Sequence, residues 1–179
     1  DTVVQTAAKS QLDMAKAHAA TADANAQKVA ANTNLTQAKQ ELSQAQAAVK
    51  AAKTPEEKAA AQAQGKSAKQ SVAKAESGYR KVSAEAKVAE AKQGVATATA
   101  NHQAAVASGN QQAQAVAKSQ MAVANSQLDK AQAEYKQTGA TVRAENTAKA
   151  VQQAQAEYDR AVVSGNTEQI SAAGAKLEA

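Results

Sequence analysis

The feature that most constrains this chain is a pair of nearly identical hexapeptides, 56 residues apart. Residues 105–110 read AVASGN and residues 161–166 read AVVSGN, and 166 − 110 = 56. A Gly followed by Asn is typical of one helix that ends in the left-handed conformation and another that begins directly after it. The repetition therefore predicts helices of similar length, joined by short turns, with a 56-residue period.

A third turn is expected one period earlier, because 110 − 56 = 54. The segment there reads TPEEK: Thr54 can cap a helix, Pro55 suits the first helical position and Glu57 can complete a capping box. At the last turn, Asn166 or Thr167 is expected to cap the next helix. The predicted helical repeats are 1–53, 54–109 and 110–165, and residues 166–179 begin a fourth.

Composition decides what kind of helix fills these intervals. Ala contributes 52 of the 179 residues and Gln 23, whereas Pro occurs once and Phe, Trp and Cys are absent. Because Ala, Gln and Lys favour helix, the chain is expected to be all-α. Large apolar side chains are too few for a bulky core, but Ala lets helix backbones approach closely. Intrinsic disorder is the main alternative, since aromatic residues are scarce.

Apolar residues recur at sevens inside the predicted helices, as they do in coiled coils. The series are Leu35, Leu42 and Val49; Val88, Val95 and His102; Met121, Leu128, Tyr135 and Val142; and Val151 with Tyr158. Ala fills the alternate seam position at Ala38, Ala45, Ala91, Ala98, Ala131 and Ala154. The pattern predicts an elongated, antiparallel bundle of three long helices with Ala-rich, coiled-coil-like seams.

These seams are expected to slip near the middle of each repeat. An earlier series is out of phase with the one that starts at Leu35, and it consists of Leu12, Ala15, Ala19, Ala22, Ala26 and Val29. Polar or Gly-containing segments lie at 32–34, 77–83 and 138–141. Each long helix is therefore expected to kink there. The alternative is that each folds back on itself, which would give stacked shorter helical hairpins.

The sequence predicts no catalytic, cofactor-binding or metal site. His18 and His102 do not form an HxxxH or HExxH motif, and Glu56 and Glu57 are explained by the start of a helix. The aromatic residues expected to pack at seams are Tyr79, Tyr135 and Tyr158. We therefore expect a protein that is not an enzyme.

The charge of the chain narrows the classes of partner. The net charge of +5 comes from 21 Lys and Arg against 16 Asp and Glu, and the basic residues are scattered along the chain. Nucleic-acid surfaces usually concentrate basic residues and add aromatic ones, so no nucleic acid is expected. No apolar run approaches the length of a membrane span, so no membrane insertion is expected. Weak attraction to anionic cell-wall polymers is compatible with this charge.

The Ala/Gln/Lys-rich repeats, seen in QLDKAQAEYKQ and VQQAQAEYDRAVVSGN, resemble helical regions of Gram-positive cell-surface proteins, particularly those of lactic-acid bacteria. The DTV start looks like a signal-peptidase product. The resemblance implies a secreted or surface-bound bacterial protein with a role in adhesion, aggregation or wall-associated spacing. Its expected partners are cell-wall polymers, glycans or other surface proteins, and the chain is expected to be a monomer or to self-associate weakly. The alternative function is that of a stress-protective or lipid-surface helical protein.

Overall fold

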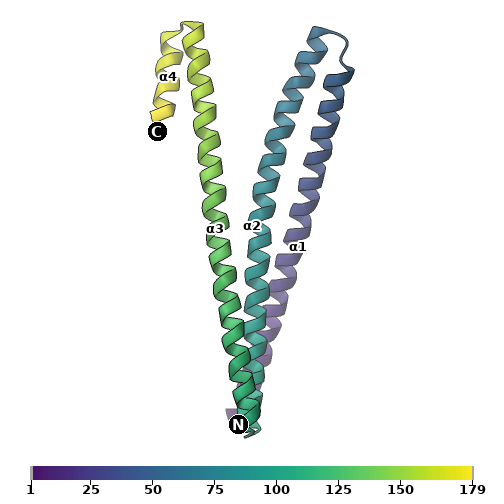
Figure 1. The fold of residues 1–179 in the computed structure, drawn as a ribbon, viewed down its shortest axis with the longest axis vertical. Helices are drawn as coiled ribbons and strands as arrows, with labels where there is room; N and C mark the ends of the chain where they lie inside the picture. Colours follow the sequence, from purple (N-terminus) through teal and green to yellow (C-terminus); the bar gives the residue numbers. More distant parts are fainter. Residues whose placement is uncertain (1, 179) are drawn as a thin grey trace. The chain divides into compact units, whose positions relative to one another are not determined.

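The computed structural model describes residues 2–178, which contain four helices and no strand. The helices are α1 (Thr2–Ala51), α2 (Pro55–Ala107), α3 (Gln111–Ser164) and α4 (Thr167–Glu178), as Figure 1 shows. The all-α prediction is confirmed. The prediction of three helices is wrong by one, because the residues interpreted as the start of a further repeat form a helix of their own.

The turn before α2 has the capping box that the sequence predicts. The Thr54 hydroxyl accepts a hydrogen bond from the Glu57 amide at 3.1 Å, and the Glu57 carboxylate accepts one from the Thr54 amide at 3.2 Å. Pro55 occupies the first helical position, where its missing N–H costs nothing. Because these contacts satisfy the start of α2 locally, the three residues 52–54 are enough to join α1 to α2.

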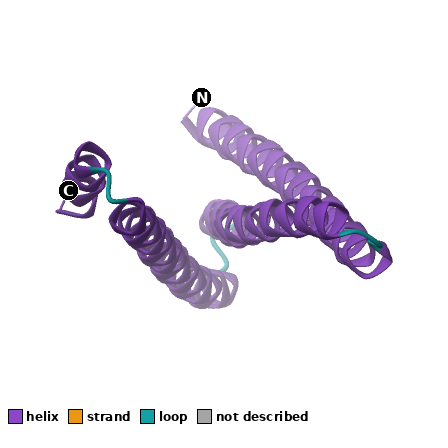
Figure 2. Cartoon of the chain, turned by 90° about the horizontal axis from the view of Figure 1, so that it is seen from above, coloured by secondary structure: helices purple, strands orange, loops and turns teal. Residues whose placement is uncertain are grey.

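The two SGN turns are also built as predicted. Gly109 and Gly165 each have φ 68°, the left-handed conformation that ends a helix. The Asn110 side chain accepts a hydrogen bond at 3.0 Å from the amide three residues further on. The Asn166 side chain accepts two, at 3.1 and 3.2 Å, from the amides two and three residues further on. Asn166, rather than Thr167, is therefore the cap of α4. Figure 2 shows these short turns as loops between helices.

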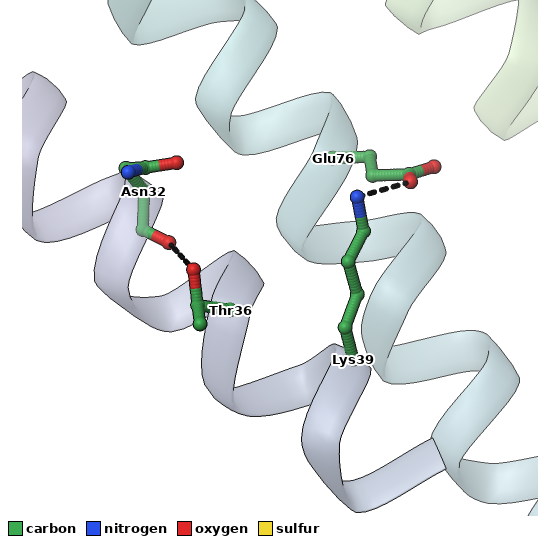
Figure 3. A network of polar contacts seen from close by, with 4 residues as sticks. All are labelled: Asn32, Thr36, Lys39 and Glu76. Atoms are coloured by element: carbon green, nitrogen blue, oxygen red, sulfur yellow. Dashed lines mark hydrogen bonds and ion pairs between the residues drawn. The ribbon is translucent and has the colours of Figure 1, made fainter. Parts of the chain in front are cut away.

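The helices continue through the segments at which a kink or a reversal was expected. All residues of 32–34, 77–83 and 138–141 are α-helical, so the alternative of stacked shorter hairpins is wrong. In α1 the Thr36 hydroxyl donates to the Asn32 carbonyl at 2.9 Å, which satisfies the hydroxyl without leaving the helix (Figure 3). Close by, Lys39 of α1 lies 3.6 Å from Glu76 of α2.

Two compact units make up the chain, one up to Thr138 and one from Gly139 onward, and the boundary lies within α3. The first unit holds α1, α2 and the first half of α3. In it α1 and α2 lie side by side in opposite directions (Figure 1). The second unit holds the rest of α3 and α4, which meet where Lys176 donates to Glu157 at 2.9 Å.

A single unbroken heptad seam covers one face of α1. Its buried and half-buried members are Met14, Ala17, Thr21, Ala24, Lys28, Ala31, Leu35, Ala38, Leu42, Ala45 and Val49. The predicted slip before Leu35 is therefore wrong. The out-of-phase series belongs to another face of the same helix, where Leu12 is 53% and Val29 67% exposed. Two series suited to packing coexist on α1, and within the unit up to Thr138 only one of them is buried or half-buried.

By contrast, α2 is covered on two faces. Toward α1, the Thr21 hydroxyl lies 3.2 Å from the Ala89 carbonyl. Toward the first half of α3, Lys87 donates to Glu134 at 2.9 Å. Apart from Leu35, the buried apolar residues are all Ala: Ala38, Ala45, Ala61, Ala68, Ala84, Ala86, Ala98, Ala105, Ala117, Ala124, Ala131, Ala161 and Ala173. The core is thus made by close approach of backbones, as the composition predicts.

At two sets of positions, burial recurs with the 56-residue period of the sequence. Ala61, Ala117 and Ala173 are 6%, 5% and 7% exposed, and 117 − 61 = 173 − 117 = 56. Ala105 and Ala161, also separated by 161 − 105 = 56, are 9% and 6% exposed. At these positions the repeat of the sequence is also a repeat of buried Ala.

Candidate functional site

An apolar groove lies between the first turns of α1 and the last turns of α2. It has a volume of about 590 Å³. Its lining is Thr6, Ala7, Ser10, Gln11, Met14, Ala100, Asn101, His102, Gln103, Ala104, Val106 and Ala107. None of these side chains is a carboxylate or an ammonium group, so the groove can hold an apolar group but offers no general acid–base pair of carboxylates.

Two of the polar residues in this lining are His102 and Gln103. The Gln103 side-chain oxygen is buried and has no hydrogen-bond partner among the residues that the structure describes. His102 is half-buried beside it in sequence. A buried acceptor without a donor costs free energy.

A second, more polar groove lies between α2 and the first half of α3. It has a volume of about 680 Å³ and is open to solvent. Its lining is Glu90, Gln93, Gly94, Thr97, Ala98, Asn101, Ser119, Gln120, Val123, Ala124 and Gln127. Amide and hydroxyl side chains dominate this set. They can both donate and accept, which is the hydrogen-bonding character of carbohydrate hydroxyls.

The two histidines lie in different surroundings. The His18 ring nitrogens lie 3.3 and 3.4 Å from the Gln93 amide nitrogen, so this contact joins α1 to α2. His102 lines the apolar groove. No group of three metal-ligating side chains occurs within residues 2–178.

The three tyrosines are half-buried, as the seam interpretation predicts. The Tyr135 hydroxyl donates to the Glu85 carboxylate at 3.1 Å, which places the ring at the contact between α2 and α3. Tyr158 lies against Gly174 of α4, where an added Cβ would stand 3.7 Å from the ring. Tyr135 and Tyr158 thus add a large ring to contacts that are otherwise made by Ala. The hydroxyl of Tyr135 contacts a carboxylate, and the ring edge of Tyr158 faces a glycine.

Two exposed ion pairs perturb carboxyl groups. Hydrogen bonding by Lys87, with its positive charge, lowers the pKa of Glu134 below its ordinary value. Lys176 does the same to the pKa of Glu157 at the contact of α3 with α4. Because the side chains of both pairs are largely exposed, these ion pairs contribute little to the stability of the helix contacts.

Comparison with known proteins gives no relative from which a site could be transferred. Neither a family model, nor a curated protein, nor a solved structure matches the chain. Within residues 2–178, none of the helices combines the length and apolar character that crossing a membrane requires.

Sequence reasoning named no site residue, and both grooves come from the packing of helices. For the polar groove, the one hint in the sequence is Gly94, a glycine inside α2. Because glycine has no side chain, it leaves space beside the helix at this position. Nothing in the sequence marks the apolar groove, because its lining combines residues separated by the whole length of α1 and α2.

Proposed function

We propose that the chain is a non-enzymatic structural and adhesion module of a bacterial cell surface. In this proposal it is an elongated, antiparallel array in which each 56-residue repeat contributes one long helix with Ala-rich seams. The observation that carries the proposal is helix length: α1, α2 and α3 contain 50, 53 and 54 residues. Each therefore extends for about 75–80 Å.

Such a helix suits spacing better than catalysis. A seam of Ala buries little apolar area per residue, so the fold spends its residues on length and not on enclosing a pocket. Ligand sites of enzymes are usually concave, apolar and largely closed, with a few convergent polar groups. The open grooves described above hold amides and hydroxyls, which supports contacts with glycans over chemistry at a reacting bond.

Charge supports an anionic partner. The net charge of +5 is spread over exposed lysines, among them Lys66, Lys69 and Lys74 on α2. Spread charges attract a polyanion weakly at each point, and the contacts add along the helix. Such a surface suits an anionic cell-wall polymer, which also offers many weak points of contact.

The test is binding of purified anionic wall polymer to the whole chain and to three linked copies, at low and high salt. Binding is expected to be weak for one copy and to strengthen on linkage. It should fade above physiological ionic strength, where the Debye length falls below about 8 Å. Replacing Lys66, Lys69 and Lys74 with Gln should weaken binding. A matched variant with Gln62, Gln64 and Gln70 changed to Asn should bind as the parent does.

The binding experiment has two informative outcomes. Salt-sensitive binding that grows with copy number supports a module with contacts spread along helix faces. Tight binding by one copy that ignores salt and the lysine changes would contradict it, because such binding requires a specific pocket.

A further inference from the structure

One apolar series of α1 is covered neither by α2 nor by the first half of α3, the elements that share its unit. Its members are Leu12, Ala15, Ala19, Ala22, Ala26 and Val29, and all six are exposed. The largest two, Leu12 and Val29, are 53% and 67% exposed. Spacing of three and four residues in alternation is the spacing of a coiled-coil seam, so these six residues form a ready helix-packing face, here called the outer face of α1.

The repeat shows what kind of neighbour this face fits. One period onward, 12 + 56 = 68 and 68 + 56 = 124, and Ala68 and Ala124 are 8% and 7% exposed. In the same way 26 + 56 = 82, and Val82 is half-buried. The heptad series of Ala68 and Val82 continues to Ala89, whose carbonyl lies 3.2 Å from the Thr21 hydroxyl of α1. The α2 positions equivalent to Leu12, Ala19 and Ala26 are therefore buried or half-buried, whereas Ser71 and Gly78, equivalent to Ala15 and Ala22, are exposed.

The outer face is also complementary to itself in the antiparallel direction. The spacing of its residues is 3, 4, 3, 4, 3 from either end. In an antiparallel pair, residues whose numbers add up to 41 lie opposite each other, which pairs 12 with 29, 15 with 26 and 19 with 22. A second copy laid antiparallel therefore puts Leu12 opposite Val29 and Ala opposite Ala. Small residues at the four inner positions let the two backbones approach closely, as they do along the seams within the chain.

Charges beside the outer face favour the same arrangement. With Leu12 at heptad position a and Ala15 at d, Lys16 and Asp23 both take position e, and both are exposed. In an antiparallel pair the e positions of the two helices flank each other. Lys16 of one copy then lies near Asp23 of the other, and symmetry repeats the contact. Charges at such flanking positions set partner and orientation.

We propose that the outer face of α1 is an interface at which two copies of this chain associate antiparallel. The contact is isologous, so it closes as a dimer and does not grow into a filament. Only about two and a half heptads with four inner Ala take part, so the dimer is weak and reversible. This pairing joins two copies side by side along α1 without any further protein.

The first test is the mass in solution by sedimentation equilibrium over a range of protein concentrations. The weight-average mass should rise from the monomer value of 18.2 kDa toward twice that value. Val29→Lys should hold the mass at the monomer value. Val163→Lys is the matched control, since Val163 is also helical and is 89% exposed on another helix, and it should behave as the parent.

The second test exchanges charges between chains. Lys16→Glu places a carboxylate opposite the carboxylate of Asp23, and Asp23→Lys places an ammonium group opposite that of Lys16. Each variant alone should therefore dimerise less than the parent. Mixed together, the two variants should form a heterodimer, because every flanking contact then joins opposite charges. A mass that stays at the monomer value for the parent, equal effects of Val29→Lys and Val163→Lys, or a mixture no heavier than its components would each overturn the proposal.

Discussion

Replacing Ala86 with Leu should destabilise the contact between α1 and α2. Ala86 is 1% exposed, and it lies one heptad before Gln93, whose amide meets His18 of α1. Leu adds an isopropyl group at a position with almost no access to solvent, so the helices must separate or the side chain must adopt a strained rotamer. Overpacking of this kind costs about 1–3 kcal/mol.

The assay is urea denaturation followed by far-UV circular dichroism. Ala60→Leu is the control, because Ala60 lies on the same helix but is exposed. Leu and Ala differ little in helix propensity, so the control should stay within about 0.5 kcal/mol of the parent. If Ala86→Leu proved as stable as the control, the Ala seam would not be in close contact and the account of the core would be refuted.

Three further changes test other parts of the structure. Asn110→Ala removes the cap of α3 and should cost about 1 kcal/mol in urea denaturation; no loss would mean that the cap is dispensable. Gly78→Ala should stabilise by about 0.5–1 kcal/mol, because Gly78 is helical and a Cβ there meets nothing within 4 Å; destabilisation would indicate a turn at that point. Lys176→Ala should raise the pKa of Glu157 toward its ordinary value in a carboxyl NMR titration, since Lys176 lowers it. Because the pKa of Glu157 is lowered, the stabilisation by this ion pair is present above the unfolded-state pKa and is lost as pH falls through the folded-state pKa. An unchanged titration of Glu157 in the variant would show that Lys176 is not the cause of the lowered pKa.

The ends of the helices could be predicted because caps are local. Thr54, Asn110 and Asn166 are each recognised from a few neighbouring residues, and each bonds an amide of its own first turn. The all-α class could be predicted from composition, because helix propensity is a property of each residue. The expected cap at Asn166 or Thr167 also indicated a helix after residue 166, but the predicted bundle counted only the three long helices.

The faces of the helices could be predicted, but not which of them are covered. A heptad series marks a side of a helix that suits packing, and both the series through Leu35 and the series through Leu12 satisfy that rule. Only the arrangement of neighbouring helices decides that the first is buried and the second is exposed. The slip expected between them was a change of face, which a one-dimensional pattern does not distinguish from a break.

The mid-repeat segments show a different limit. Gly78 and the polar residues around Asn32 weaken a helix locally, and the sequence allowed a kink or a reversal there. A helix-interior Gly costs about 1 kcal/mol relative to Ala, which a seam that continues on both sides can offset. The grooves were inaccessible from sequence, because each brings together residues from two helices at positions set by their packing.

The most direct test of the central claim, that each repeat is one uninterrupted helix, is a distance between spin labels at positions 66 and 92. Lys66 and Lys92 are both exposed on α2, on either side of segment 77–83, and the absence of native cysteine permits labelling at introduced ones. An unbroken helix over 92 − 66 = 26 residues predicts a backbone separation of about 39 Å by pulsed electron paramagnetic resonance. A separation below about 20 Å would require the chain to fold back between the labels, and it would contradict the account.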